Sequence, residues 1–247
     1  LYAPWRGNAS PVCLLPNREG GLFSYDPFDE ELPNWNGLCF GGSGSGKSFT
    51  VAQLMLMFAI SRRRPRIIWM DNGASSKRLV ENLGGEFIDF RMGSDIAINM
   101  FDMPKGESAP SPERVKLILA VLELILKEED QRGISKQLKA LLEEAIYSLY
   151  RLQKNRTPQL GDLRDYLRAH PHESMHKCAD VLYSWTGDTA FGRMLDRPTN
   201  ITLDKDLITL EMQSLNAYSE FKNVIMLLLT AHIQDRARGD ESREYQL

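Results

Sequence analysis

Eight residues from Gly41 to Ser48 have the types and the spacing needed to hold a phosphate group. They fit the pattern G-x-x-x-x-G-K-[ST] at every fixed position. Glycines let the backbone curl so that successive N–H groups point at a phosphate. Lys47 can reach the β- and γ-phosphates of a nucleotide, and the Ser48 hydroxyl can ligate Mg²⁺. We therefore predict a nucleotide site made of Gly41, Gly42, Ser43, Gly44, Ser45, Gly46, Lys47, Ser48 and Phe49.

The segments on either side of this loop support the prediction. Residues 36–40 resemble a turn and a short apolar strand that enters the loop, and residues 49–60 have the apolar content of a helix that leaves it. The N-terminus of such a helix carries a partial positive charge that favours a bound phosphate. A flexible Gly/Ser-rich linker is the alternative, but linkers do not carry a lysine and flanking elements in this register.

Two acidic residues are candidates for the catalytic acid of nucleotide hydrolysis. Asp71 follows the apolar run 67–70, and Glu211 lies inside the apolar run 207–212. Asn72 follows Asp71 where a hydrolytic enzyme usually has a glutamate, and no apolar strand in the chain ends in Asp-Glu. Either Asp71 and Glu211 substitute for that pair, or a strand that begins at Tyr245 carries it in a longer protein. We prefer the second interpretation.

Composition is ordinary for a soluble globular protein, with 43% hydrophobic and 26% charged residues. The net charge of −3 weakly disfavours a surface devoted to nucleic acid. The three cysteines, Cys13, Cys39 and Cys178, are far apart, which indicates reduced thiols in a cytosolic protein. No run approaches the length of a membrane span.

The order of patterns predicts an α/β fold with a mostly parallel sheet, divided into four segments. Residues 1–36 form a β-rich segment with strands near 12–15 and 22–25, and residues 37–104 form the first part of a nucleotide-binding core. Residues 105–190 are an inserted all-α subdomain, because helical periodicity and caps at Ser111 and Ser135 dominate there. Residues 191–247 continue the core, with apolar strand-like runs at 201–203 and 207–212 and a helix at 223–233.

A neighbouring subunit can complete a phosphoryl-transfer site with an arginine. Arg193 and Arg197 lie in the glycine-containing loop after the helical insertion, and we regard them as candidates for this role. The alternative is that both are ordinary loop charges.

Several segments together resemble the ATPases of type IV secretion and conjugative transfer, the TraC class. The similarity extends over nearly the whole chain, although only the phosphate loop is specific by itself. The segments that carry it are 36–48, Asp71-Asn72-Gly73 with Leu79 and Leu83-Gly84-Gly85, Ile98-Asn99-Met100-Phe101, Phe191-Gly192-Arg193-Met194-Leu195-Asp196 and 207–212.

This resemblance implies a RecA-like P-loop domain that binds ATP and Mg²⁺ and contains a helical insertion. It also implies a hexameric or similar ring at the cytoplasmic side of a bacterial inner membrane, working with other secretion-system subunits. ATP hydrolysis there would power pilus biogenesis and substrate transfer. In such proteins the Walker B acids follow the position of Leu247, so this chain is expected to bind nucleotide and to hydrolyse it poorly.

Four other functions remain open from the sequence. A DNA-translocating ATPase of the FtsK, HerA or coupling-protein kind would share the core, although the acidic balance is mildly against it. A small-molecule kinase would use the helical insertion as a lid over its second substrate. A regulatory GTPase would show an N-K-x-D clamp, which the sequence lacks. An interaction scaffold with a structural nucleotide site is the fourth.

Overall fold

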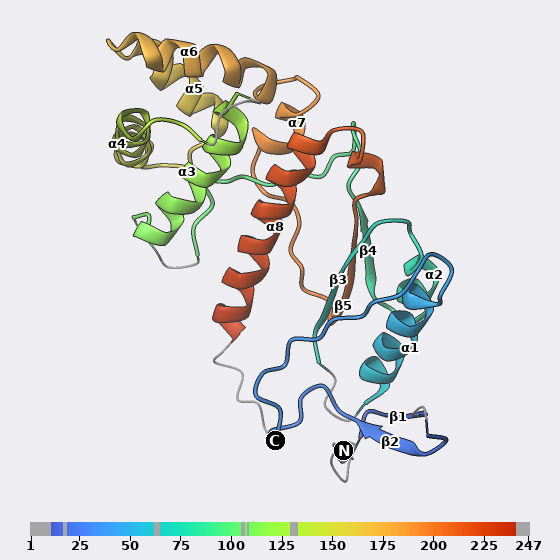
Figure 1. Cartoon of the computed structure of the whole chain (residues 1–247). Coiled ribbons are helices and arrows are strands. Elements are labelled where there is room, and N and C mark those ends of the chain that lie inside the picture. The colour runs from blue at the N-terminus through green and yellow to red at the C-terminus, as the bar shows by residue number, and fades with distance from the viewer. Residues whose placement is uncertain are drawn as a thin grey trace. The chain divides into compact units, whose positions relative to one another are not determined.

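The computed structural model of the protein describes residues 11–16, 19–61, 65–104, 107, 109–128 and 133–240, with side chains of the last helix described as far as residue 237. These residues form two compact units, whose elements are labelled in Figure 1. The first unit extends to Ile88 and is completed by Asp204–Glu211. The second unit consists of Asp89–Leu203 and of the chain from Met212 onward. The strand expected from Tyr245 lies outside the described residues.

A short antiparallel hairpin belongs to the first unit. β1 (Cys13–Pro16) pairs with β2 (Leu22–Tyr25), so that Cys13 lies opposite Tyr25 and Pro16 opposite Leu22. Proline is tolerated at the end of such a strand because it removes only one donor from the ladder. These strands confirm the two apolar runs predicted near 12–15 and 22–25.

Three strands form the central sheet of the first unit, in the order β3-β5-β4. β3 (Ile67–Asp71) and β5 (Leu207–Glu211) run parallel, and their register pairs Asp71 with Glu211. β4 (Glu86–Asp89) lies on the other side of β5. All of β5 is buried because it is the middle strand, whereas β3 is half-buried along its length. The predicted parallel sheet is therefore present, and residues 207–211 supply its centre.

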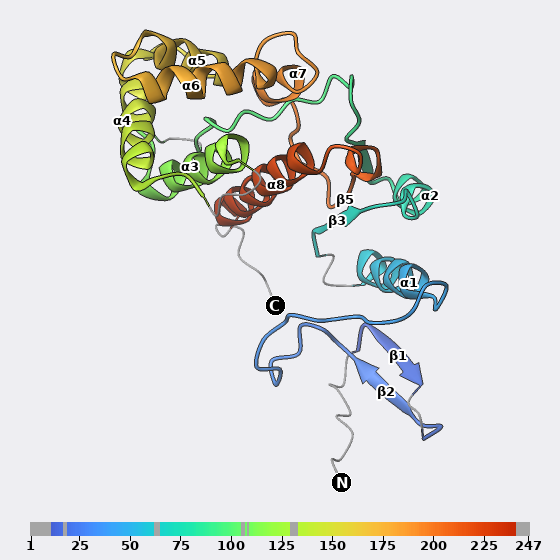
Figure 2. The same cartoon turned by 45° about the horizontal axis from the view of Figure 1, so that its top comes forward.

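Two helices pack on this sheet from the same side (Figures 1 and 2). α1 (Lys47–Ile60) contributes Met55 and α2 (Lys77–Asn82) contributes Val80 to a core that also contains Leu207 of β5. Partly buried apolar residues of the same elements surround this core, namely Ile67, Trp69, Leu79 and Leu83. Burial of this apolar surface holds the helix after the phosphate loop against the sheet.

Gly84 and Gly85 bring the end of α2 close to β5. Gly84 has a φ of 73°, a left-handed conformation that ends a helix without the strain a Cβ would add. A Cβ on Gly85 would lie 2.6 Å from the carbonyl oxygen of Leu207 and 2.7 Å from Val80 Cγ1. Any larger residue at Gly85 would push the α2–β4 connection away from the central strand.

Two predicted strands are wrong. Residues 36–40 form no strand in the described part of the chain, and Leu38 and Phe40 are 86% and 85% exposed, because no neighbouring strand pairs with this segment. Residues 201–203 also form no strand. Leu203 has a φ of 50°, which is incompatible with an extended strand. Apolar composition alone does not reveal either feature.

Four helices of the second unit lie within residues 105–190. α3 (Pro112–Leu126) and α4 (Lys136–Leu152) begin at Ser111 and Ser135, whose hydroxyls accept the backbone N–H of Arg114 and Leu138. α5 (Leu160–Ala169) and α6 (Glu173–Leu182) lie side by side in both views, and α6 continues into a short 3-10 turn, η1 (Tyr183–Trp185). Across the described ranges, no helix is both long and apolar enough to cross a bilayer.

The second unit is larger than the segment 105–190 expected from the sequence. It begins at Asp89 and includes α7 (Gly192–Leu195), the 3-10 turn η2 (Gln213–Leu215) and α8 (Ser219–Asp240). α8 packs along α3, and Arg114 of α3 forms an ion pair with Asp235 of α8. The side chain of Arg114 is only 10% exposed, so this contact fixes α8 in the helical unit.

Candidate nucleotide-binding site

The glycine-rich loop in front of α1 has the backbone conformation that the sequence predicts. Gly44 and Gly46 have φ values of 76° and 89°, in the left-handed region that a side chain would strain. Gly46 is the residue that precedes α1, and no side chain caps the first N–H groups of this helix. These N–H groups are therefore available to a bound anion, together with the positive end of the helix.

Lys47 extends over the entrance of the loop. Its Nζ donates hydrogen bonds to the carbonyl oxygens of Gly41 and Gly42, both at 2.6 Å. A Cβ on Gly41 would lie 2.3 Å from Ser45 Oγ and 3.2 Å from Lys47 Cγ. A side chain at Gly41 would therefore force the Ser45 hydroxyl to move and would crowd the stem of Lys47.

A small open pocket of ≈ 270 Å³ lies at this loop and is lined by residues 44–49. Ser48 is exposed in the first turn of α1, where its hydroxyl is accessible to a cation bound to phosphate oxygens. Phe49 is 73% exposed beside it. The described residues contain no cluster of three or more His, Cys, Asp or Glu side chains suited to a metal ion. The exposed Ser48 hydroxyl fits one ligand of a Mg²⁺ ion that is also held by phosphate oxygens.

Glu211 is brought next to Asp71, but its carboxylate is already engaged by the backbone. It is 4% exposed, and its oxygens accept the N–H of Gly73 at 3.1 and 3.2 Å. The N–H of Ala74 donates a further, short hydrogen bond to Glu211 Oε2. Successive N–H groups of this kind form a nest that stabilises a negative charge. This arrangement gives Glu211 a structural role in the loop after β3.

Asp71 binds the following part of the same loop. Asp71 Oδ2 accepts hydrogen bonds from Ser75 Oγ at 3.0 Å, Ser76 N at 3.2 Å and Ser76 Oγ at 2.9 Å, and Oδ1 accepts the N–H of Asn72 at 2.8 Å. Burial raises the pKa of Asp71, but the hydrogen bonds from Ser76, Asn72 and Ser75 outweigh burial and lower it below its usual value. The ionised carboxylate is thus the form that the loop requires.

Ser75 and Ser76, in the loop after β3, were not identified as functional from the sequence. Ser76 is buried, and its hydroxyl also lies 3.1 Å from Thr209 Oγ1 of β5. The run of Asn, Gly and Ser after an apolar strand does signal a turn stabilised by local hydrogen bonds. Nothing in the sequence signals the partnership with Thr209 and Glu211, because it depends on strand register.

Arg193 and Arg197 lie in the second unit, in and just after α7. Arg197 is 3.4 Å from Asp188 Oδ1, in a largely exposed pair. Arg193 is exposed and has no side-chain ion pair or hydrogen bond with another described residue. Its guanidinium is therefore accessible to another molecule, whereas Arg197 is partly neutralised.

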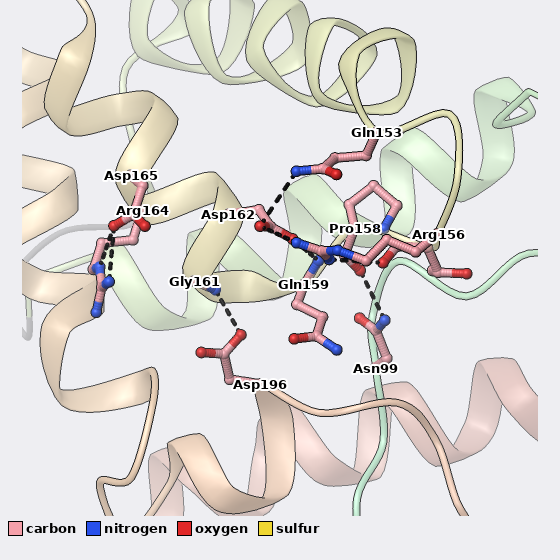
Figure 3. Close-up of polar contacts among 11 residues, drawn as sticks. Asn99, Gln153, Arg156, Pro158, Gln159, Gly161, Asp162, Arg164, Asp165 and Asp196 are labelled. Carbon is pink, nitrogen blue, oxygen red and sulfur yellow. Dashed lines mark hydrogen bonds and ion pairs between the residues drawn. The ribbon is translucent and has the colours of Figure 1, made fainter.

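The remaining segments of the family resemblance hold the second unit together. Ile98 N donates to Met194 O at 2.8 Å, and Asn99 Nδ2 donates to the carbonyl of Pro158 at 2.8 Å. Asp196 accepts the N–H of Gly161 at 2.6 Å and that of Gly187 at 2.8 Å. Figure 3 shows Asp196 and Asn99 reaching the start of α5 from two different segments. Their role is to join distant parts of the chain.

An aromatic cluster completes this junction. Phe191 stacks on Phe221 with ring centroids 4.5 Å apart and planes inclined by 13°, and Trp185 lies 4.9 Å from Phe191. Position 192 requires glycine, because a Cβ there would lie 2.4 Å from the carbonyl carbon of Thr186. The segment 191–196 therefore connects α5, η1 and α8 within the second unit.

Comparison with known proteins identifies the same fold and family. The profile of the family described as the TraG P-loop domain matches residues 23–235. The structure of VirB4 of Thermoanaerobacter pseudethanolicus superimposes with a TM-score of 0.79 and 22% sequence identity, covering 96% of this chain. This chain spans 66% of the length of that VirB4 chain. No curated protein sequence matches significantly. The predicted P-loop NTPase fold is confirmed.

Proposed function

Because the chain belongs to the TraG P-loop domain family, we propose that it is the ATP-binding motor domain of a bacterial type IV secretion or conjugation system. Hydrolysis of ATP would power pilus biogenesis and substrate transfer. The observation that carries this proposal is the phosphate loop itself, whose positive-φ glycines and uncapped helix N-terminus lie within the matched residues.

The residues of the loop have separate roles in this proposal. The N–H groups from Gly42 to Ser48 would hold the β-phosphate, and Lys47 would leave the carbonyls of Gly41 and Gly42 to bind the β- and γ-phosphates. Mg²⁺, when bound, would neutralise negative charge that develops on the phosphates during transfer. Ser48 would supply its hydroxyl to that ion, and the exposed Phe49 ring would lie beside the nucleotide.

We further propose that Asp71 and Glu211 shape the edge of the sheet and do not activate the attacking water. A general base must reach the proton it removes, and both carboxylates are occupied by hydrogen bonds from residues 72–76. The group that activates the attacking water is then neither Asp71 nor Glu211.

A ring of identical subunits, docked with other secretion subunits at the cytoplasmic side of an inner membrane, is the assembly we propose. An arginine from the next subunit would stabilise the transferred phosphoryl group. Arg193 is the better candidate because it is exposed and makes no side-chain ion pair within the described ranges.

Nucleotide binding by the Lys47→Ala variant tests the proposal directly. We expect ATP and ADP affinity to fall at least about tenfold, because one charge-assisted contact with phosphate is lost. Lys205→Ala is the matched control, since it removes an exposed lysine of the same unit. Normal nucleotide affinity of Lys47→Ala would overturn the proposal.

ATP turnover as a function of protein concentration tests the ring. A site completed by a neighbouring subunit predicts specific activity that rises with concentration and falls in Arg193→Ala. Measurable specific activity that is constant with concentration and unchanged by Arg193→Ala would contradict the proposed assembly.

A further inference from the structure

A groove of ≈ 620 Å³ crosses the outer face of α4 in the second unit. Its walls come from Glu144, Tyr147 and Arg151 of α4, from Lys154 just beyond the helix, and from Ala109 and Pro110 before α3. Both views place α4 at the edge of this unit (Figures 1 and 2). The groove is thus formed by two chain segments that are far apart in sequence.

The groove side of α4 is only partly buried. The opposite side buries Leu142, Ala145, Ile146 and Leu149 against neighbouring helices. Residues 144, 147 and 151 follow the i, i+3, i+7 spacing of a single helix face. A partly exposed stripe with this spacing is a candidate for binding another molecule.

The charged residues of the groove, Glu144, Arg151 and Lys154, differ from other charged residues of this unit in their ion pairing. Arg156 pairs with Asp162 at 2.6 Å, and Lys139 pairs with Glu123 at 2.9 Å. By contrast, none of the three charged residues of the groove forms an ion pair with another described residue. Arg151 donates only to Ser148 Oγ, at 2.9 Å. Glu144 is two helical turns from Arg151, about 10 Å along the axis, so the groove has an anionic and a cationic end.

Tyrosine rings line the groove between these ends. The Tyr150 hydroxyl donates to the carbonyl of Phe101 at 2.6 Å, which fixes the ring. Burial raises the pKa of Tyr150, an effect that Arg114 opposes and Asp102 reinforces, so the phenol stays neutral. Tyr147 is half-buried. Rigid aromatic rings provide large contact area with little loss of side-chain entropy.

We propose that this groove docks a peptide segment of a partner protein that carries carboxylates next to an aromatic residue or proline. The carboxylates would pair with Arg151 and Lys154, and the apolar residue would lie on the tyrosine rings. Glu144 disfavours a phosphate backbone along the same groove, because every nucleotide carries a charge, whereas a peptide can place an uncharged residue next to Glu144. A peptide is therefore preferred over a single-stranded nucleic acid.

Fluorescein-labelled poly(Glu,Tyr) copolymer is a suitable probe, measured by anisotropy against poly-Glu and oligo(dT). We expect saturable binding of poly(Glu,Tyr), tighter than that of poly-Glu. The double variant Arg151→Glu/Lys154→Glu should weaken it at least about tenfold. Tyr147→Ala should weaken binding of the copolymer more than binding of poly-Glu, and thermal unfolding checks that the variant remains folded, because part of the ring is buried.

The control is Lys116→Glu/Lys136→Glu, which makes the same charge change at exposed lysines of α3 and α4 outside the groove. Equal loss of binding in this control would overturn the proposal, because the copolymer would then be attracted by surface lysines in general and not by the groove. Absence of copolymer binding, or displacement of the copolymer by oligo(dT), would also overturn it. ATP binding is measured in every variant, and its retention separates failure of this inference from failure of the proposed nucleotide site.

Discussion

Asp71 and Glu211 are register partners at the ends of parallel strands β3 and β5, and together they hold the loop that connects β3 to α2. Glu211 binds the N–H groups of Gly73 and Ala74, while Asp71 binds Ser75 and Ser76. Two carboxylates side by side would repel one another in a site of low polarity. Here each carboxylate is compensated by its own set of donors, so the pair stabilises the loop.

Replacing Glu211 by glutamine tests whether the buried charge holds the loop. Glutamine keeps one carbonyl oxygen but turns an NH₂ group toward backbone N–H donors, which leaves at least one buried group unsatisfied. We expect the free energy of unfolding to fall by about 1–3 kcal/mol. Urea denaturation measures this change, and amide exchange at residues 73 and 74 should accelerate.

Glu81→Gln is the matched control for this experiment, because Glu81 is an exposed residue of α2 in the same unit. Its stability should stay within about 0.5 kcal/mol of the wild type. A Glu211→Gln protein with wild-type stability and unchanged exchange at residues 73 and 74 would show that the hydrogen bonds from these N–H groups to the Glu211 carboxylate do not stabilise the loop.

Ala74→Gly should stabilise the protein. Ala74 has a φ of 52°, a left-handed conformation that costs a residue with a Cβ about 1–2 kcal/mol. Glycine removes this strain, but it also gains entropy in the unfolded chain, so we expect a net gain of about 0.5–1 kcal/mol. Ala52→Gly, inside α1, should instead destabilise by about 1 kcal/mol. Thermal unfolding of both variants measures the contrast, and destabilisation by Ala74→Gly would be inconsistent with a strained loop.

The lowered pKa of Asp71 predicts that the free energy of unfolding falls when this carboxylate is protonated in acid. Its pKa is lower in the folded protein than in the unfolded chain, despite burial, because of the hydrogen bonds from Ser76, Asn72 and Ser75. A lowered folded pKa means that this stabilisation is fully present above the unfolded value of about 3.9 and disappears as pH falls through the folded value. The stability difference between wild type and Asp71→Asn should therefore shrink between pH 5 and strongly acidic pH. A difference that is constant across this range would show that ionisation of Asp71 does not matter.

The sequence was sufficient to predict elements whose signals are local. The phosphate loop has its glycines and lysine at fixed spacing, and α3 and α4 begin at the serines that cap them. The strand 36–40 was wrong because apolar residues form a strand only when a neighbour pairs with them. The left-handed Leu203 has no sequence signal at all.

The roles of the acidic candidates could not be predicted, because they depend on contacts between distant segments. Glu211 meets Gly73, 138 residues away in the sequence, through the register of β3 and β5. Periodicity identifies an acidic residue in a buried strand, but it does not show which donors surround that residue. The same reason explains why the sequence shows Asp196 only as part of a segment that carries the family resemblance, whereas the structure shows it to be a link between α5 and the loop at Gly187.

Asp196→Asn tests that link. One carboxylate oxygen accepts Gly161 N and the other accepts Gly187 N, so asparagine can satisfy only one of the two donors. We expect a loss of about 1–3 kcal/mol in the free energy of unfolding. Asp188→Asn is the control, because the Asp188 side chain is 89% exposed and, among the described residues, makes only the long contact with Arg197. Equal stability of the two variants would mean that Asp196 does not hold this junction.

Gly41 and Gly42 form a matched pair for testing the shape of the phosphate loop. A Cβ at Gly41 would collide with Ser45 Oγ and crowd the stem of Lys47, whereas a Cβ at Gly42 would meet no atom within 4 Å. Gly41→Ala must therefore displace Ser45 or Lys47, and with them the groups proposed to hold the phosphates. We expect its ATP affinity to fall at least about tenfold, the loss of one charge-assisted contact, and that of Gly42→Ala to fall much less. Fluorescent ATP titration compares the two variants, and thermal unfolding confirms that both are folded. If both variants bind ATP equally, the close packing of Gly41 on Ser45 and Lys47 does not shape the site, and the loop amides alone determine affinity.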